Sequence, residues 1–324
     1  MKRPVWVDYL RGKICVQGAM MPNLGLAFVT PAPLSAPAAV VGFAEKCEAM
    51  GVHSMWTIDR IAYDNLEPLM LMAAAAGATT RIRLGTSVLL PALRHPALLA
   101  KSVASLDVIA NGRFTLGIGF GSRESDFSAV GVPFAARGSR TVEAIQLMKR
   151  LWTEENVTHK GRFFAVEALT VGPKPIQNPF PIWCGGSADA ALRRAGTWAD
   201  GYICGSSAIP ELPSIWEKIA AYARAVGRDP GTIEKAGLTF MAINDRKAEA
   251  LEKIAAYLTR YYGRVRGDIE NTYIAGSPAE CAERADAMFR MGLNTLIIGL
   301  ADPDPRQLDL FADKVLPQLR ARLS

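Results

Sequence analysis

The sequence predicts a (β/α)8 barrel, and three observations support this fold class. Short β-rich runs alternate with longer helical patterns from residue 21 to the end of the chain. Eight such strands can be counted, each followed by a helix, which is the order of a TIM barrel. The 324 residues, half of them hydrophobic, suffice to bury the core of one such barrel. A doubly wound open sheet, built from the same βαβ unit, is the structural alternative.

Each strand is expected where a short run of apolar and β-branched residues lies between turn residues. In chain order, the expected strands cover residues 24–30, 53–58, 82–88, 114–119, 182–185, 201–204, 237–243 and 295–299. Because the strands of such a barrel run parallel, their carboxyl ends meet on one rim.

Each helix is expected from apolar residues at a period near 3.6. Residues 37–50 place Phe43 and Cys47 on one face, and Gly51 then ends the helix. Pro96 marks the start of the third helix. In chain order, the expected helices cover residues 37–50, 67–78, 95–109, 139–152, 187–197, 211–226, 247–262, 278–291 and 305–323.

Two stretches depart from the regular alternation. Residues 153–180, after the fourth strand, mix charged, aromatic and proline residues and predict an excursion over the barrel. Phe163 and Phe164 in this excursion fit either a hydrophobic lid or a packed segment. Before the eighth strand, the helical patterns over 247–262 and 278–291 predict an extra helical segment.

Residues 21–324 are expected to form a single barrel domain, and residues 1–20 an N-terminal extension. The extension is expected to be either an appended, disordered arm or residues upstream of a true start near Met20 and Met21. Its apolar stretch is short and interrupted by Asp8, unlike that of a signal peptide. No run approaches the ~18 apolar residues that span a bilayer.

The composition narrows the class of partner. A net charge of +6 mildly favours anionic small molecules, but the basic residues are scattered, so we expect no nucleic-acid partner. The five cysteines are widely spaced and form no C-x-x-C pair, which favours a reducing cytoplasm over a disulfide framework. The three histidines form no i, i+4 pair, so we expect no metal site.

Four expected strands end in segments whose residues could carry chemistry. These tips are WTID at 56–59, GTSV at 85–88, GIGFGS at 117–122 and PIWCGGS at 181–187. Because active sites of such barrels lie at the carboxyl ends of the strands, the four tips predict one pocket on the rim.

Glycines dominate two of these tips. Gly185, Gly186 and Ser187 lie between a strand and a helix, with Ser187 as the expected N-cap, so free N–H groups and the helix dipole could bind a phosphate. A capped turn with nothing bound explains them as well. Gly117, Gly119 and Gly121 fit either a turn that needs small residues or a bare backbone that a flat ring can approach.

Polar residues near the tips allow more than one role. Asp59 follows an apolar strand, so its carboxylate is expected to bind a ligand or backbone donors, or to pair with Arg60. His95 stands at the start of a helix, where bonding to local backbone is its expected role.

Several spaced motifs form a combination that points to one family. They are RHPALLAK at 94–101, LD at 106–107, GRFTLGIG at 112–119, FxxxGVPFxxR at 127–137, PIWCGG at 181–186 and ADGYI at 199–203. Together they resemble the bacterial luciferase-like superfamily of flavin- and deazaflavin-dependent oxidoreductases. The resemblance implies a (β/α)8 barrel, often dimeric, that binds reduced FMN or coenzyme F420 at the C-terminal rim.

The resemblance also assigns roles to residues of this chain. Asp59 matches an acidic residue that contacts the deazaflavin head group, and Ser87 with Val88 matches a non-proline cis peptide that backs the cofactor ring. Further cofactor contacts are implied for Leu90, Phe120, Gly121 and Ser122, and a phosphate-binding turn for Gly185, Gly186, Ser187 and Ala188.

Three positions depart from particular branches of the family. Arg60 and Ser122 stand where the sugar-phosphate dehydrogenase branch has a His and a Glu, which argues against that particular dehydrogenation. Phe120 stands where bacterial luciferases have an Arg that meets the FMN phosphate. The departure favours coenzyme F420 over FMN.

The resemblance therefore implies an oxidoreductase that binds reduced coenzyme F420 and transfers a hydride to or from a small organic substrate. Asp59 and Arg60 are its expected catalytic residues, with Arg60 polarising the substrate, and only Glu124 or His95 suggest themselves as proton donors. One alternative is an FMN-dependent two-component monooxygenase supplied by a separate reductase. A second is a non-catalytic flavin-binding barrel. A cytoplasmic homodimer without a membrane partner is expected.

Overall fold

Eight parallel strands form a closed barrel in the computed structural model, which describes residues 15–16, 19–20, 22–29, 38–265 and 268–324. The strands are β3 (Asn23–Phe28), β4 (Ser54–Thr57), β5 (Arg83–Thr86), β6 (Phe114–Ile118), β9 (Ile182–Gly185), β10 (Gly201–Gly205), β11 (Glu234–Ile243) and β13 (Thr295–Leu300). Their order is β10-β9-β6-β5-β4-β3-β13-β11, and pairing of β10 with β11 closes the barrel. Closure confirms the predicted (β/α)8 fold and excludes the open sheet.

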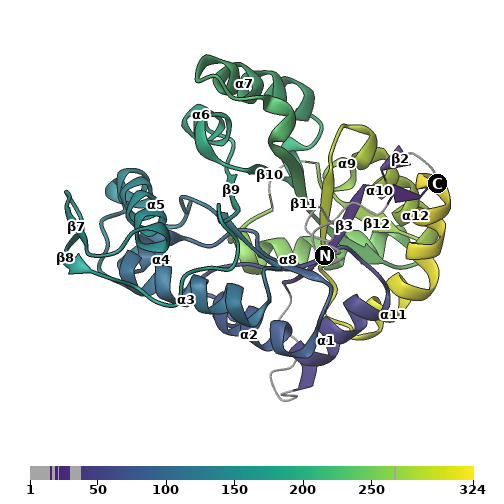
Figure 1. Cartoon of the computed structure of the whole chain (residues 1–324). Helices are drawn as coiled ribbons and strands as arrows, with labels where there is room; N and C mark the ends of the chain where they lie inside the picture. The colour runs from purple at the N-terminus through teal and green to yellow at the C-terminus, as the bar shows by residue number, and fades with distance from the viewer. Residues whose placement is uncertain (1–14, 17–18, 21, 30–37, 266–267) are drawn as a thin grey trace, which may run out of the picture.

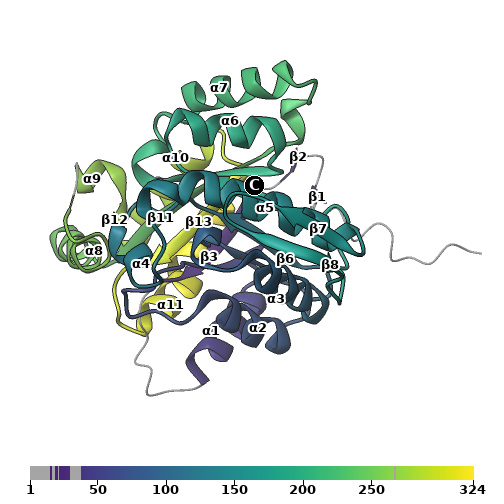
Figure 2. The same ribbon diagram turned by 90° about the vertical axis from the view of Figure 1, so that its left-hand side faces the viewer.

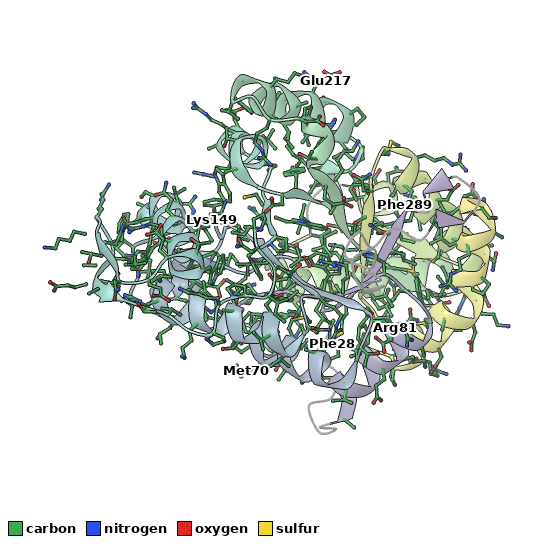
Figure 3. All side chains as sticks on the ribbon, viewed as in Figure 1. Phe28, Met70, Arg81, Lys149, Glu217 and Phe289 are labelled. Carbon is green, nitrogen blue, oxygen red and sulfur yellow. The ribbon has the colours of Figure 1, made fainter. Side chains whose placement is uncertain are left out.

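Helices surround the strands, as Figure 1 shows. The longer ones are α1 (Ala38–Ala49), α2 (Pro68–Ala78), α3 (Pro96–Ile109), α5 (Arg137–Thr153), α6 (Asp189–Trp198), α7 (Leu212–Ala225), α8 (Lys247–Tyr262), α10 (Pro278–Arg290) and α12 (Leu316–Leu323). The helix expected over 305–323 is divided into α11 (Arg306–Leu310), a π-turn and α12. Met70 on α2 and Glu217 on α7 lie on the outer side of this ring (Figure 3).

The predicted excursion is a β-hairpin. Strands β7 (Val157–Lys160) and β8 (Ala165–Leu169) pair antiparallel between α5 and β9. Phe164 is buried and Phe163 packs against the same core, so the excursion is a packed segment rather than an open lid. Glu143 of α5 holds it, because its carboxylate accepts hydrogen bonds from the backbone N–H groups of Phe163 and Phe164.

The extra helical segment is also present. After β11 come α8, α9 (Ile269–Thr272) and β12 (Ile274–Gly276), which pairs with the end of β11. In Figure 2, α8 and α9 lie on the same side of the molecule as α4 (Glu124–Ser128), and all three follow the carboxyl ends of barrel strands. They therefore flank the rim where the four tips end.

Only part of the N-terminal extension falls within the described residues. There, β1 (Cys15–Val16) pairs antiparallel with β2 (Ala19–Met20). The remainder of the arm expected over 1–20 lies outside the described residues. No helix in the described ranges has the length and apolar character needed to cross a membrane. Cys47, Cys184, Cys204 and Cys281 are buried free thiols.

Two tryptophans fill the barrel interior. The rings of Trp56 on β4 and Trp183 on β9 lie 5.2 Å apart, and Trp56 is almost fully buried. Neighbouring strands carry glycine beside them, because a Cβ atom at Gly85 would lie 2.3 Å from Trp56 and one at Gly201 would lie 2.7 Å from Trp183. The tryptophans are core residues, and they form a floor beneath the rim.

We expect His53 to make the stability of the fold depend on pH. Burial and the neighbouring Arg83 lower the pKa of His53 to about 4, and its Nδ1 has no hydrogen-bond partner within the described ranges. The imidazole is neutral in the folded chain but protonates below about 6.5 in the unfolded chain. Stability is therefore complete above pH 6.5 and falls by roughly 3 kcal/mol as the pH drops to 4. Denaturant unfolding of wild type and His53→Gln at both pH values checks this, and an unchanged pH dependence in the variant would contradict it.

Candidate active site

The four predicted tips lie on strands that are neighbours in the barrel. Thr57 of β4 pairs with Thr86 of β5, Leu89 bridges to Ile118 of β6, and Ile118 pairs with Cys184 of β9. Because these strands are parallel, their tips end on the same rim. The predicted convergence of the four tips is confirmed.

Asp59 is buried beside the third strand's tip, where its carboxylate joins two segments. Oδ2 accepts a hydrogen bond of 2.8 Å from the backbone N–H of Leu90, and Arg94 donates to both carboxylate oxygens at 2.6 and 3.1 Å. The alternative pairing of Asp59 with Arg60 is therefore wrong. Leu90, held at its backbone by this contact, packs its buried side chain against Phe127.

Arg94 is a site residue that reasoning from the sequence missed. Besides Asp59, it pairs with Glu67 at 2.8 Å. Glu67 is in turn the N-cap of α2, accepting hydrogen bonds from the N–H groups of Leu69 and Met70. The available signal was the RHPALLAK motif at 94–101, which begins with Arg94. His95 caps α3 by accepting from the N–H of Ala97, as expected.

Arg60 points to a different set of partners. Its Nε donates to Asp126 at 2.7 Å, and its Nη1 donates to the carbonyl of Tyr261 at 2.8 Å. Asp126 also accepts from the backbone N–H groups of Ile61 and Ala62. Arg60 thus joins the loop after β4 to α4 and to the C-terminal end of α8. The negative end of the helix dipole there favours a cation.

Tyrosines of α8 form a second group that the sequence did not reveal. Tyr257 and Tyr261 stack at 5.8 Å, and Arg123 lies 4.7 Å from the rings of both Tyr261 and Tyr262. Burial raises the pKa of Tyr257 and Tyr261 above the usual range, so both hydroxyls stay protonated. The i, i+4 spacing of Tyr257 and Tyr261 on the expected helix was the available signal.

The Ser87–Val88 peptide bond is cis, as the resemblance implied. Val88 inserts between two glycine tips, because a Cβ atom at Gly119 would lie 2.3 Å from its Cγ2 and one at Gly185 would lie 3.1 Å from its Cγ1. A side chain at position 119 would therefore collide with Val88, so glycine is needed there. Neither the expected turn nor the expected approach of a flat ring is this reason. The hydroxyl of Ser87 is buried and has no hydrogen-bond partner among the residues that the structure describes.

The tip over residues 117–122, at the end of the fourth barrel strand, is built around aromatic side chains. Gly121 has a φ of +71° and lies against Phe127, where a Cβ atom would be 2.5 Å from the ring. The guanidinium of Arg194 lies over the ring of Phe120, 4.1 Å from the ring centre. Ser122 is exposed to solvent, as is Glu124, so neither is held in place as a proton-transfer group.

The turn over Gly185–Ala188 opens to solvent ahead of α6. Its N-cap is Ala188, which lacks a capping side chain, so the expectation that Ser187 caps the helix is wrong. The reason is that α6 begins at Asp189, which places Ser187 one residue before the cap. In the described chain, the backbone N–H groups of Gly186, Ser187 and Ala188 have no acceptor. Tyr202 donates to the carbonyl of Gly186 and orients the turn.

These observations fit a phosphate-bearing ring cofactor. An uncapped helix start with free N–H groups suits an anionic phosphate. The unpartnered hydroxyl of Ser87, beside the half-buried Val88, offers a polar and an apolar contact to a ring on the same rim. A separate hollow of about 310 Å³, lined by residues such as Trp216 and Lys235, lies by α7 and the start of β11, away from the tips.

The fold and this rim define a (β/α)8 barrel of the kind that holds a cofactor at the carboxyl ends of its strands. Residues 23–270 match the luciferase-like monooxygenase family, and the chain belongs to that family. It is 34% identical over 281 residues to the F420-dependent glucose-6-phosphate dehydrogenase of Kineococcus radiotolerans, covering 82% of this chain and 80% of the relative.

Solved structures share the same fold. An F420-dependent secondary alcohol dehydrogenase, solved with an F420–acetone adduct, has a TM-score of 0.80 and 23% identity, covering 93% of this chain and 100% of its own. The oxygenating constituent of 3,6-diketocamphane monooxygenase from Pseudomonas putida, solved with FMN, has a TM-score of 0.74 and 22% identity, covering 93% of this chain and 99% of its own.

Proposed function

We propose that this protein is an oxidoreductase that binds reduced coenzyme F420 at the barrel rim and transfers a hydride to or from a small organic substrate. The observation that carries the proposal is one contact: Val88 of the cis peptide packs on Gly185, the first residue of the phosphate-type turn. The positions proposed to bind the ring and the phosphate are therefore adjacent. The F420-dependent relative at 34% identity supports the choice of cofactor.

In this proposal, each part of the rim holds a different part of the cofactor. Ser87, Val88 and Leu90 contact the ring, and the N–H groups of Gly186, Ser187 and Ala188 bind the phosphate. Bound there, coenzyme F420 supplies hydride transfer. Asp59 fixes the Leu90 segment and so orients the head group.

The substrate side of the rim lies toward α8. Arg60 is paired with Asp126 there, and its contacts to Asp126 and Tyr261 fix the end of that helix. The protonated tyrosines of α8 exclude water and can donate hydrogen bonds to a substrate oxygen. The site therefore suits a substrate with an oxygen function at the reacting carbon, an alcohol or a carbonyl compound.

Titration of the purified protein with F420 and with FMN, followed by difference spectra, tests the proposal. We expect saturable binding of F420 and weaker binding of FMN. Tight FMN binding without F420 binding would contradict it and favour the two-component monooxygenase, whose oxygen consumption would be coupled to product formation. Bound reduced F420 that no alcohol or carbonyl substrate reoxidises would favour a non-catalytic barrel.

We also propose that the protein is a cytoplasmic homodimer. The buried free thiols are compatible with a reducing compartment. Met70 on α2 and Leu98 on α3 are 65% and 68% exposed, on two helices that pack side by side. We propose that these two side chains belong to one apolar patch, which is typical of an interface. A separate reductase is required only if the cofactor is FMN.

We expect the double substitution Met70→Lys and Leu98→Lys to convert a dimer into a monomer. Two charges placed in an apolar interface would remain unpaired in the dimer, whereas both side chains are solvated in the monomer. Light scattering coupled to size exclusion measures the change, and Ile176→Lys, which alters another exposed apolar residue, serves as the control. A wild-type protein that is monomeric at micromolar concentration would contradict the expectation.

A further inference from the structure

Three arginines lie at or beside the tip over residues 117–122 of the fourth barrel strand. Arg194 of α6 stacks on Phe120, and Arg137 of α5 donates to the carbonyl of the next residue, Gly121, at 3.2 Å. Arg140 lies one turn further along α5. In the described part of the chain, none of these three arginines forms an ion pair with a carboxylate. We call Arg137, Arg140 and Arg194 the arginine strip.

The strip is continuous across two helices. A Cβ atom at Gly138 would lie 3.9 Å from Nη2 of Arg194, so the first turn of α5 touches the side chain from α6. Arg140 donates from Nε to the carbonyl of Ala92 and lies over the ring of Phe164, which leaves its two terminal nitrogens free in the described chain. The three guanidinium groups therefore belong to one surface.

Positive charge is costly at this place in the fold. Arg137 and Arg140 stand in the first turn of α5, which has no acidic residue and no capping side chain, although a helix start favours negative charge. All three side chains are half-buried, and burial lowers the pKa of Arg140 and Arg194. Glu143, the acid nearest to Arg140 in sequence, partly offsets this lowering for Arg140, but its carboxylate oxygens bond His159 and the N–H groups of the hairpin.

By contrast, two other arginines of the rim form ion pairs with carboxylates. Arg60 has Asp126, and Arg94 has both Asp59 and Glu67. Unneutralised, partly desolvated guanidinium groups on one surface indicate a ligand with several anionic oxygens, because charge-assisted hydrogen bonds there would be strong. The strip also adjoins the phosphate-type turn, since Arg194 lies six residues, about 9 Å of helix, after Ala188.

We propose that the arginine strip binds the carboxylates of the acidic tail that coenzyme F420 carries beyond its phosphate. This inference rests on the proposed function and extends it from the ring and phosphate to the far end of the cofactor. The strip would select F420 over FMN, because FMN ends at its phosphate and leaves the guanidinium groups without partners.

Equilibrium binding to four probes tests the inference without any measurement of turnover. The probes are the deazaflavin riboside without phosphate or tail, the tail-less phosphate form, F420 with several glutamates, and FMN. We expect the dissociation constant of wild type to fall about tenfold from the tail-less form to the glutamate-bearing form at low salt, and this gain to shrink in 0.5 M salt.

The variants Arg194→Gln and Arg140→Gln are expected to lose about threefold to tenfold in affinity for the glutamate-bearing form only. Arg322→Gln, which removes one exposed charge from α12, is the matched control and should bind all probes as wild type does. Circular dichroism checks that each variant is folded.

Two results would overturn the inference while leaving the proposed function intact. One is equal affinity of wild type for the tail-less and glutamate-bearing forms. The other is an equal loss of affinity for the tail-less and glutamate-bearing forms in Arg194→Gln, which would make the strip part of the phosphate site. If no deazaflavin probe binds at all, the proposed function fails, and the inference fails with it.

Discussion

Replacing Asp59 with alanine is expected to lower the free energy of unfolding by about 2–4 kcal/mol, because Arg94 loses its buried partner and keeps only the more exposed Glu67. The Asp59 and Arg94 side chains are 1% and 18% exposed, and their nitrogen and oxygen atoms are 2.6 Å apart. The substitution also leaves the N–H of Leu90 without its acceptor. Urea denaturation of the two proteins measures the difference.

The conservative variant separates charge from hydrogen bonding. Asp59→Asn keeps an oxygen that can accept from Leu90 but loses the charge facing Arg94, so a smaller loss is expected. Asp64→Ala is the matched control, because its ion pair with Arg260 is exposed on both sides, at 54% and 56%, and should contribute less than about 1 kcal/mol. Equal losses in Asp59→Ala and Asp64→Ala would show that the buried pair is not a stabilising element.

The same variants report on the cofactor site. Because Asp59 holds Leu90, and Leu90 follows the Ser87–Val88 segment, loss of the carboxylate should release that segment from the rim. We expect Asp59→Ala to bind F420 at least tenfold more weakly than wild type, and Asp59→Asn, which keeps an acceptor for Leu90, to lose less affinity. Unchanged affinity would remove Asp59 from the proposed site.

Replacing Gly119 with alanine is expected to weaken F420 binding more than tenfold at a modest cost in stability. The new Cβ atom would lie 2.3 Å from Cγ2 of Val88, so Val88 must move away from the position proposed to bind the ring. Overpacking of this kind costs about 1–3 kcal/mol. Binding titrations and urea denaturation of the same sample measure the two effects.

Gly77→Ala is the matched control for this substitution. Gly77 lies in α2 with nothing within 4 Å of a Cβ atom there, so alanine should raise stability by roughly 0.5–1 kcal/mol and leave binding unchanged. If Gly119→Ala bound F420 as tightly as wild type, the contact between Val88 and the glycine tip would have no part in the cofactor site.

Much of the fold could be predicted because periodicity is a local property. Strand alternation and the 3.6 period appear in consecutive residues, and the helix over 247–262 was predicted with the bounds that α8 has. The excursion and the extra helical segment were predicted for the same reason, since both interrupt a regular pattern. Closure of the barrel, by contrast, depends on the pairing of β10 with β11, which are neighbours in sequence but at opposite ends of the strand order.

The glycines show where prediction from the sequence ended. Gly119 and Gly185 were singled out as residues without side chains, yet the side chain that occupies the space belongs to Val88, in the segment after β5. Sequence spacing carries no information about which distant atom fills a gap, so the reason for each glycine could be found only in the packed structure.

Partner choice among charged residues was decided by the tertiary structure as well. The sequence placed Asp59 and Arg60 side by side and located the tips on one rim. In the structure, Asp59 forms an ion pair with Arg94, and Arg60 forms one with Asp126. Successive residues beyond a strand end project in different directions, whereas residues 35 or 66 positions apart meet when the barrel closes. The sequence by itself therefore determined the fold class and the site's position, and the tertiary structure decided which side chains meet there.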